Sequence, residues 1–102
     1  MTEAEQAMKA KNDISRAVRA DELLSNPLYK EAVEAIEVSL HETFKDTKLE
    51  DDKLRHELWQ RMQLMKQFES RFESLLKAGE KGKQTLSLLE KAKQKLLNLL
   101  NP

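Results

Sequence analysis

The sequence contains no cysteine, so it offers neither a disulfide framework nor thiolate chemistry. Only two glycines and two prolines occur among 102 residues, which excludes long flexible linkers and folds with many tight turns. Aromatic residues make up 5% of the chain, too few for most β-sandwiches and barrels. The 18 basic and 18 acidic residues cancel, which excludes a strongly basic coat for nucleic acid and a strongly acidic mimic of it.

Long apolar runs are also missing. The longest are pairs such as Leu23-Leu24 and Leu99-Leu100, far short of the roughly 20 residues that a membrane-spanning helix needs. The first five residues include two acids and no apolar stretch, so we expect no signal peptide and no membrane partner. Together with the absence of cysteine, this pattern favours a reducing compartment, the cytoplasm.

Leucine and the good helix-forming residues dominate what is present, which is typical of long helices. We predict a first helix over 3–24, with Thr2 and Glu5 as a capping box and with Asn12-Asp13 as an alternative start. The triplet Ser25-Asn26-Pro27 ends this helix and caps a second one over 27–45. The second helix has one continuous apolar stripe, made of Tyr29, Val33, Ile36, Leu40 and Phe44.

A third helix is predicted over about 50–78, with Asp51 and Asp52 at its positive end. Gly79 is expected to end it in the left-handed conformation, and Thr85 to cap a fourth helix over 85–100. The predicted fold is therefore all-α, a three- to four-helix assembly with a central antiparallel hairpin of the second and third helices. Its expected parts are an N-terminal arm (1–24), a hairpin core (25–79) and a basic amphipathic helix (80–102).

Neither catalytic nor metal-binding motifs are complete. His41-Glu42 and His56-Glu57 begin like the zinc motif His-Glu-x-x-His, but Lys45 and Gln60 stand where the second histidine is required. The two histidines could still share one metal across the hairpin, although two ordinary surface histidines are the simpler interpretation. Four acids of the second helix are interpreted as a solvated face: Glu31, Glu34, Glu37 and Glu42. We therefore predict no enzyme and no cofactor.

The distribution of charge and leucine points to the C-terminal segment. Residues 1–50 hold 7 basic and 11 acidic residues, whereas residues 51–102 hold 11 basic and 7 acidic ones. We predict a partner or self-association interface made of Leu86, Leu89, Leu96, Leu97 and Leu100. Phosphate or acidic-partner contacts are assigned to Lys81, Lys83, Lys91, Lys93 and Lys95. These lysines have no interleaved aromatic or arginine residue, so nucleic acid is a less favoured partner than protein.

One stretch resembles a known group of proteins. Residues 23–32 read LLSNPLYKEA, and Ile36-Glu37, an aromatic at Phe44 and 57–59 (ELW) follow. Over about 19–80 the chain is similar to small all-helical proteins that tailed bacteriophages and prophages encode among their head-assembly and DNA-packaging genes. Members often carry tryptophan where this chain has Phe44. The resemblance implies a context and no catalytic residue.

The predicted function is that of a non-enzymatic, phage-encoded interaction protein in head assembly or DNA packaging. It would act as a homo-oligomer with phage structural or packaging proteins, in the host cytoplasm or associated with the virion. Two alternatives remain open from the sequence. One is a nucleic-acid-binding accessory protein that uses the C-terminal lysines, and the other is an inhibitor that docks a helix into a groove of a host protein.

Overall fold

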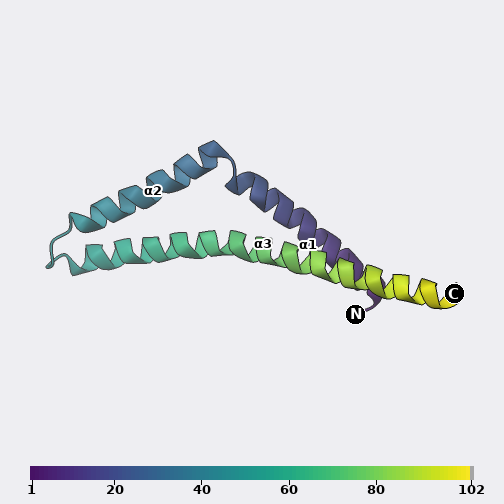
Figure 1. Cartoon of the computed structure of the whole chain (residues 1–102). Helices are drawn as coiled ribbons and strands as arrows, with labels where there is room; N and C mark the ends of the chain where they lie inside the picture. Colours follow the sequence, from purple (N-terminus) through teal and green to yellow (C-terminus); the bar gives the residue numbers. More distant parts are fainter. Residues whose placement is uncertain (102) are drawn as a thin grey trace. The chain divides into compact units, whose positions relative to one another are not determined.

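The computed structural model describes residues 1–101, and these form three α-helices without any strand. They are α1 (Glu3–Leu24), α2 (Pro27–Lys45) and α3 (Asp52–Leu100), shown in Figure 1. The all-α prediction is therefore confirmed. Pro102, the last residue of the predicted segment 80–102, lies outside the described residues.

The first helix begins as its capping pattern predicts. The Glu5 N–H donates to the Thr2 hydroxyl at 3.1 Å, and the Gln6 N–H donates to the Thr2 carbonyl at 2.9 Å. Asn12-Asp13 does not start a new helix, since α1 is continuous from Glu3 to Leu24. Asp13 instead accepts a hydrogen bond from Lys9 at 3.2 Å, an i,i+4 ion pair that is compatible with an uninterrupted helix.

The second helix has the predicted bounds and the predicted cap. The Asn26 side-chain oxygen accepts from the Leu28 N–H at 2.9 Å and from the Tyr29 N–H at 3.2 Å, while Pro27 occupies the first turn. These bonds satisfy N–H groups that have no partner within the helix. Asp51 precedes α3 and acts differently: its carbonyl accepts the first helical bond, from the Arg55 N–H at 2.9 Å, while its carboxylate accepts from the Lys48 N–H at 3.1 Å in the turn before the helix.

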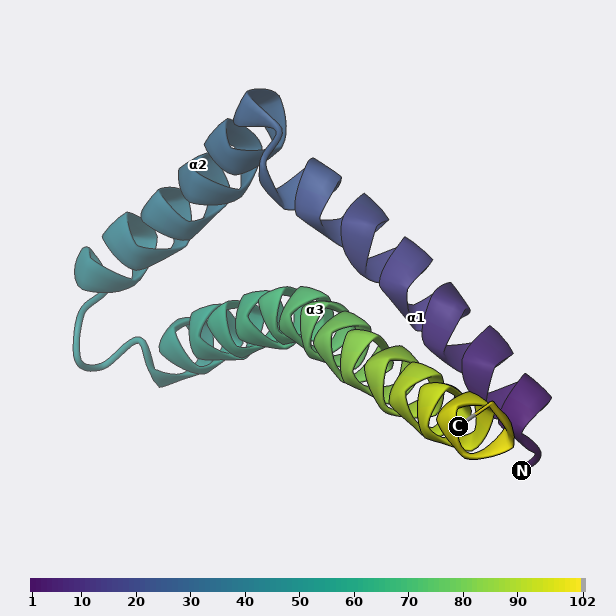
Figure 2. The same ribbon diagram turned by 45° about the vertical axis from the view of Figure 1, so that its right-hand side comes forward.

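The third helix corrects the sequence prediction. It does not end near residue 78, and no fourth helix exists among the described residues, because α3 runs unbroken from Asp52 to Leu100 (Figure 2). Gly79 does not adopt the left-handed conformation, since no glycine has a positive φ. Thr85 is no N-cap either: its hydroxyl donates to the Lys81 carbonyl at 3.0 Å inside the helix.

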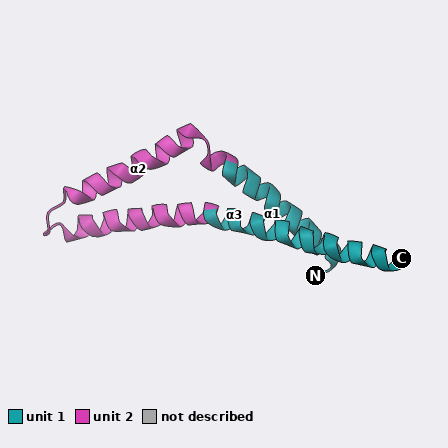
Figure 3. Cartoon of the chain, in the orientation of Figure 1, with its two compact units in different colours: residues 1–21, 73–102 teal, residues 22–72 magenta. Residues whose placement is uncertain are grey.

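The chain divides into two compact units (Figure 3). Unit 1 comprises residues 1–21 and 73–102, and unit 2 comprises residues 22–72. The first unit thus brings most of α1 together with the C-terminal part of α3. Within residues 1–101, no helix is both long enough and apolar enough to cross a membrane.

Candidate interaction surface

In unit 1, α1 and α3 approach each other at small residues. A β-carbon added to Gly79 would overlap the β-carbon of Ala17, and one added to Gly82 would lie 2.7 Å from the carbonyl oxygen of Ala10. Ala10 and Ala20 are also two of the three buried hydrophobic residues described, at 3% and 5% exposure. Both glycines therefore serve a close helix contact, which compensates for the roughly 1 kcal/mol that glycine costs in a helix interior.

Gly79 and Gly82 belong to a regularly spaced set of positions along α3, which we call the heptad seam. Alternating steps of four and three residues run without interruption from Leu54 to Leu100. The positions are Leu54, Leu58, Arg61, Met65, Phe68, Phe72, Leu75, Gly79, Gly82, Leu86, Leu89, Lys93, Leu96 and Leu100. A mean spacing of 3.5 residues is the heptad pattern, which keeps one stripe of a long helix turned toward its partners.

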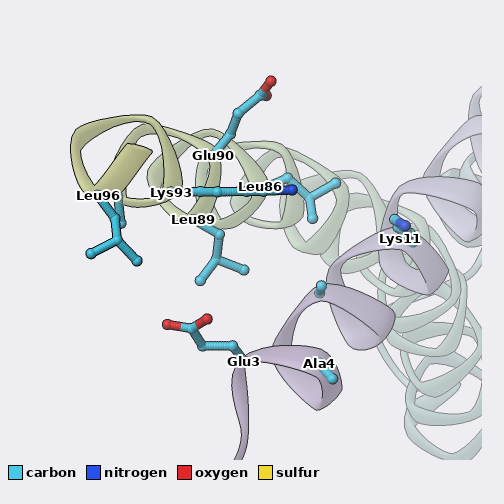
Figure 4. A pocket seen from close by; sticks show the side chains of 10 residues that line it. Glu3, Ala4, Lys11, Leu86, Leu89, Glu90, Lys93 and Leu96 are labelled. Carbon is cyan, nitrogen blue, oxygen red and sulfur yellow. The ribbon is translucent and has the colours of Figure 1, made fainter. Parts of the chain in front are cut away.

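Where α1 begins, the first turns of α1 and residues 86–96 of α3 border an open groove, which we call the terminal groove. Its walls include Ala4 and Ala7 from α1 and Leu86, Leu89 and Leu96 from α3, and its volume is about 650 Å³. Its charged residues are Glu3, Lys11, Glu90 and Lys93. Figure 4 shows Leu89 and Leu96 extending from α3 on the side where α1 begins. An apolar floor with charged residues at its edge is the usual anatomy of a protein contact.

The five leucines predicted as an interface fall into two groups. Leu86 and Leu89 are half-buried in the terminal groove, close to α1. Leu96, Leu97 and Leu100 are exposed by 59%, 43% and 69%. Leu88 and Leu99, which the prediction did not include, are exposed to a similar degree. The C-terminal end of α3 is thus a leucine-rich helix that unit 1 itself leaves largely uncovered.

The five lysines predicted as contacts are all exposed, as is Lys77. With 100° of rotation per residue, Lys77, Lys81, Lys91 and Lys95 fall within an arc of about 80°. This arc, which we call the lysine stripe, lies on the side of α3 opposite the heptad seam. Lys93 differs from these four, because it occupies a seam position and lines the terminal groove. Lys83 lies between the two faces, so the predicted set of lysines does not share one surface.

In unit 2, α2 lies against residues 52–72 of α3. The Tyr29 ring centroid is 6.5 Å from that of Phe68 and 6.0 Å from that of Phe72, and the two phenylalanines are 5.2 Å apart. At the other end of α2, the Arg55 guanidinium lies 4.5 Å from the Phe44 ring centroid. Low residue numbers in α2 therefore contact high residue numbers in α3, so the two segments run in opposite directions.

The aromatic contacts place Tyr29 in a partly apolar site. Desolvation by burial raises the pKa of the Tyr29 phenol above its ordinary value of 10.0, and the Glu69 carboxylate raises it further. The Tyr29 phenol is therefore neutral at neutral pH, as an ordinary phenol is, and the raised pKa extends its neutral form to higher pH. Such a group supports packing and does not supply a base.

The two histidines lie in different surroundings. His41 lines a small hollow of about 120 Å³ with Glu37, Met62 and Met65, whereas His56 stacks on Trp59 with ring centroids 6.0 Å apart. Within residues 1–101, no group of three or more histidine, cysteine or acidic side chains gathers closely enough to hold a metal ion. Three of the acids named above, Glu31, Glu34 and Glu42, border a shallow surface over α2.

Sequence reasoning missed the role of the two glycines, although a signal existed. Leu75, Gly79, Gly82 and Leu86 are separated by four, three and four residues, so both glycines continue the heptad seam. On α1, Ala7, Ala10, Ile14 and Ala17 are separated by three, four and three residues, which is the same alternation of steps. Small residues at matching positions of two helices indicate a close crossing and not a break.

Comparison of the chain with protein-family models, with curated proteins and with solved structures finds no match.

Proposed function

We propose that this protein is a non-enzymatic helical interaction protein that works by self-association. The supporting observation is the imbalance between buried and exposed apolar side chains. Among the described residues, only Ala10, Ala20 and Leu58 are buried hydrophobics, whereas seventeen large hydrophobic side chains are exposed by 41% or more. Helices with apolar faces gain most of their stability from covering those faces, so further copies or partners are needed to cover them.

The biological setting that we propose is the assembly of a bacteriophage head or the packaging of its DNA. The resemblance of residues 19–80 to small phage proteins supports this setting. In this proposal α2 and residues 52–78 of α3 act as an antiparallel hairpin scaffold, and the C-terminal end of α3 provides the contact surface. The partners are further copies of the chain and the structural or packaging proteins of the particle, in the host cytoplasm or on the virion.

Light scattering of the purified protein tests this proposal. We expect a mass that is a multiple of 11.9 kDa and that falls on dilution. The double variant Leu97→Gln/Leu100→Gln should shift the mass to that of one copy, since glutamine keeps the helix propensity while removing apolar surface. Val38→Gln is the matched control, because Val38 on α2 is 47% exposed, close to the 43% of Leu97.

A second measurement adds candidate particle proteins to the sample, and a mixed complex that the double variant fails to form supports the assembly role. A wild-type mass of 11.9 kDa at every concentration, with no mixed complex, would remove the proposed function.

Binding to nucleic acid is a second candidate function, favoured by the lysine stripe. Four exposed lysines on one side of α3 can contact successive phosphates without disturbing the heptad seam. If all four contact duplex DNA, the logarithm of the binding constant should fall with the logarithm of salt concentration with a slope of about −3.6. Replacing the four lysines by glutamine should abolish binding and leave the mass in solution unchanged. Absence of binding at low salt would dismiss this candidate.

A further inference from the structure

The small hollow between α2 and α3 in unit 2 gathers side chains that the proposed function does not use. His41 from α2 lines it together with Met62 and Met65 from α3. Both methionines are half-buried, whereas His41 is exposed to solvent. Thioether sulfur and imidazole nitrogen are both metal ligands, so two helices bring three donor groups to one hollow.

Helix geometry directs these donors toward one another. Met62 and Met65 are three residues apart, so they lie on the same face of α3. The contact of Phe44 with Arg55 sets the register of the two antiparallel segments. In that register His41 faces a part of α3 that precedes Met65. Since side chains lean toward the N-terminus of their own helix, the side chains of His41 and Met65 lean toward each other along the hollow.

The size of the hollow and its donor types select a soft metal ion. The volume is about 120 Å³, below the roughly 300–1,000 Å³ of pockets that take organic ligands. Thioether ligands favour Cu(I), whereas Mg²⁺ and Ca²⁺ prefer oxygen ligands. Histidine and acidic side chains by themselves do not gather closely enough for a metal ion within residues 1–101, so the two sulfur atoms are needed to complete a site.

The charges around the hollow suit a monovalent cation. Glu37, Lys66 and Glu69 also line it, and two carboxylates and one ammonium group give a formal charge of −1. Two thioethers and a neutral imidazole add no charge, so a bound Cu(I) ion keeps its charge of +1. The surrounding side chains offset that charge without serving as ligands.

We propose that unit 2 binds one soft monovalent metal ion, Cu(I) or the chemically similar Ag(I), through the sulfur atoms of Met62 and Met65 and an imidazole nitrogen of His41. The ion joins α2 to α3 and therefore stabilises unit 2 according to its occupancy. The site uses none of the residues proposed for self-association, so it stands apart from the proposed function.

Titration of the full chain with silver nitrate in chloride-free buffer tests the site, because Ag(I) shares the charge and softness of Cu(I) and needs no reductant. Isotope labelling of the methionine methyl groups gives four signals, one for each methionine in the chain. Silver should shift the signals of Met62 and Met65 and saturate at one equivalent. The signals of Met1 and Met8, which are 76% and 74% exposed, should stay in place.

Matched variants separate this site from unspecific binding to sulfur or imidazole. Met62→Leu and Met65→Leu conserve apolar volume, and His41→Gln keeps a polar side chain at an exposed position. Each should raise the dissociation constant for Ag(I) by about tenfold or more. The controls Met8→Leu and His56→Gln should leave it unchanged, and circular dichroism without silver checks that every variant is folded.

Silver should also raise the melting temperature of the wild type and leave that of the double variant Met62→Leu/Met65→Leu unchanged. A wild-type protein that binds no silver at micromolar concentration overturns this inference. A folded double variant that binds silver as tightly as the wild type overturns it as well, because the ion then lies elsewhere. Neither result changes the mass in solution by which self-association is judged.

Discussion

Replacing Gly79 by alanine tests whether α1 and α3 touch where the structure places them. In an isolated helix this change is favourable, since alanine has the better helix propensity by about 1 kcal/mol. Here the new β-carbon would overlap the β-carbon of Ala17. Because both atoms are fixed to their backbones, no side-chain rotation relieves the overlap, and the helices must separate.

The two effects have opposite signs, and their sizes decide the outcome. Overpacking costs about 1–3 kcal/mol, and a clash between two backbone-anchored atoms belongs in the upper half of that range. After subtraction of the propensity gain, we expect Gly79→Ala to lower the free energy of unfolding by about 1–2 kcal/mol. For a domain of this size, the melting temperature should fall by roughly 4–16 °C.

A double variant isolates the contact from the propensity. Ala17→Gly alone should destabilise by about 1 kcal/mol, through helix propensity. Combined with Gly79→Ala, it moves the one β-carbon from α1 to α3 at the same place, so the double variant should lie within about 1 kcal/mol of the wild type. Urea denaturation followed by circular dichroism measures all three variants.

Gly82 supplies a contrasting case. Its added β-carbon would lie 2.7 Å from the backbone oxygen of Ala10, an atom that no substitution of Ala10 removes. Gly82→Ala should therefore destabilise the protein, and Ala10→Gly should fail to rescue it. If Gly79→Ala instead stabilises the protein by about 1 kcal/mol, as it would in a solvent-exposed helix, then α1 does not pack on α3 at this position and the reasoning is refuted.

Three further outcomes are expected. Asn26→Ala should cost about 1 kcal/mol of stability in urea denaturation, because it removes the cap of α2, whereas Ser25→Ala should cost much less. Arg55→Leu should lower the free energy of unfolding by about 1–2 kcal/mol, since it removes the contact with Phe44 and a 2.8 Å hydrogen bond to Thr47. Lys53→Leu is the control, and an equal loss of stability in both variants would contradict a stabilising role for the Arg55 contacts. The ultraviolet titration of Tyr29, the one tyrosine, should give a pKa above 10.0 that Glu69→Gln lowers. Because the pKa of Tyr29 is higher in the folded state than in the unfolded state, the contribution of Tyr29 to stability is complete below about pH 10 and is lost as the pH rises through the raised pKa. A folded protein whose tyrosine titrates like that of the urea-unfolded chain would contradict this.

Local chemistry was enough to predict most helix boundaries. Asn26-Pro27 ends one helix and caps the next because the proline restricts the preceding residue and the asparagine side chain satisfies free N–H groups. Thr2 acts in the same local way at the start of α1. These interactions span at most a few residues, so a short stretch of sequence is enough to predict them.

The sequence alone predicted only part of the surface that we propose for self-association. Periodicity identified Leu86 and Leu89 as apolar positions, but it could not show that α1 covers them in part and leaves Leu97 and Leu100 open. Coverage depends on where α1 begins relative to α3. That register is set by contacts between residues about seventy positions apart, such as Ala10 with Gly82.

By itself the sequence therefore determined an all-helical chain, the position of its first interruption and the residues of its apolar stripes, because each follows from interactions within one or two helical turns. Only the tertiary structure decided that Gly79 and Gly82 continue a helix. Their local preference is to end one, and that preference is outweighed where the missing β-carbons let a second helix approach.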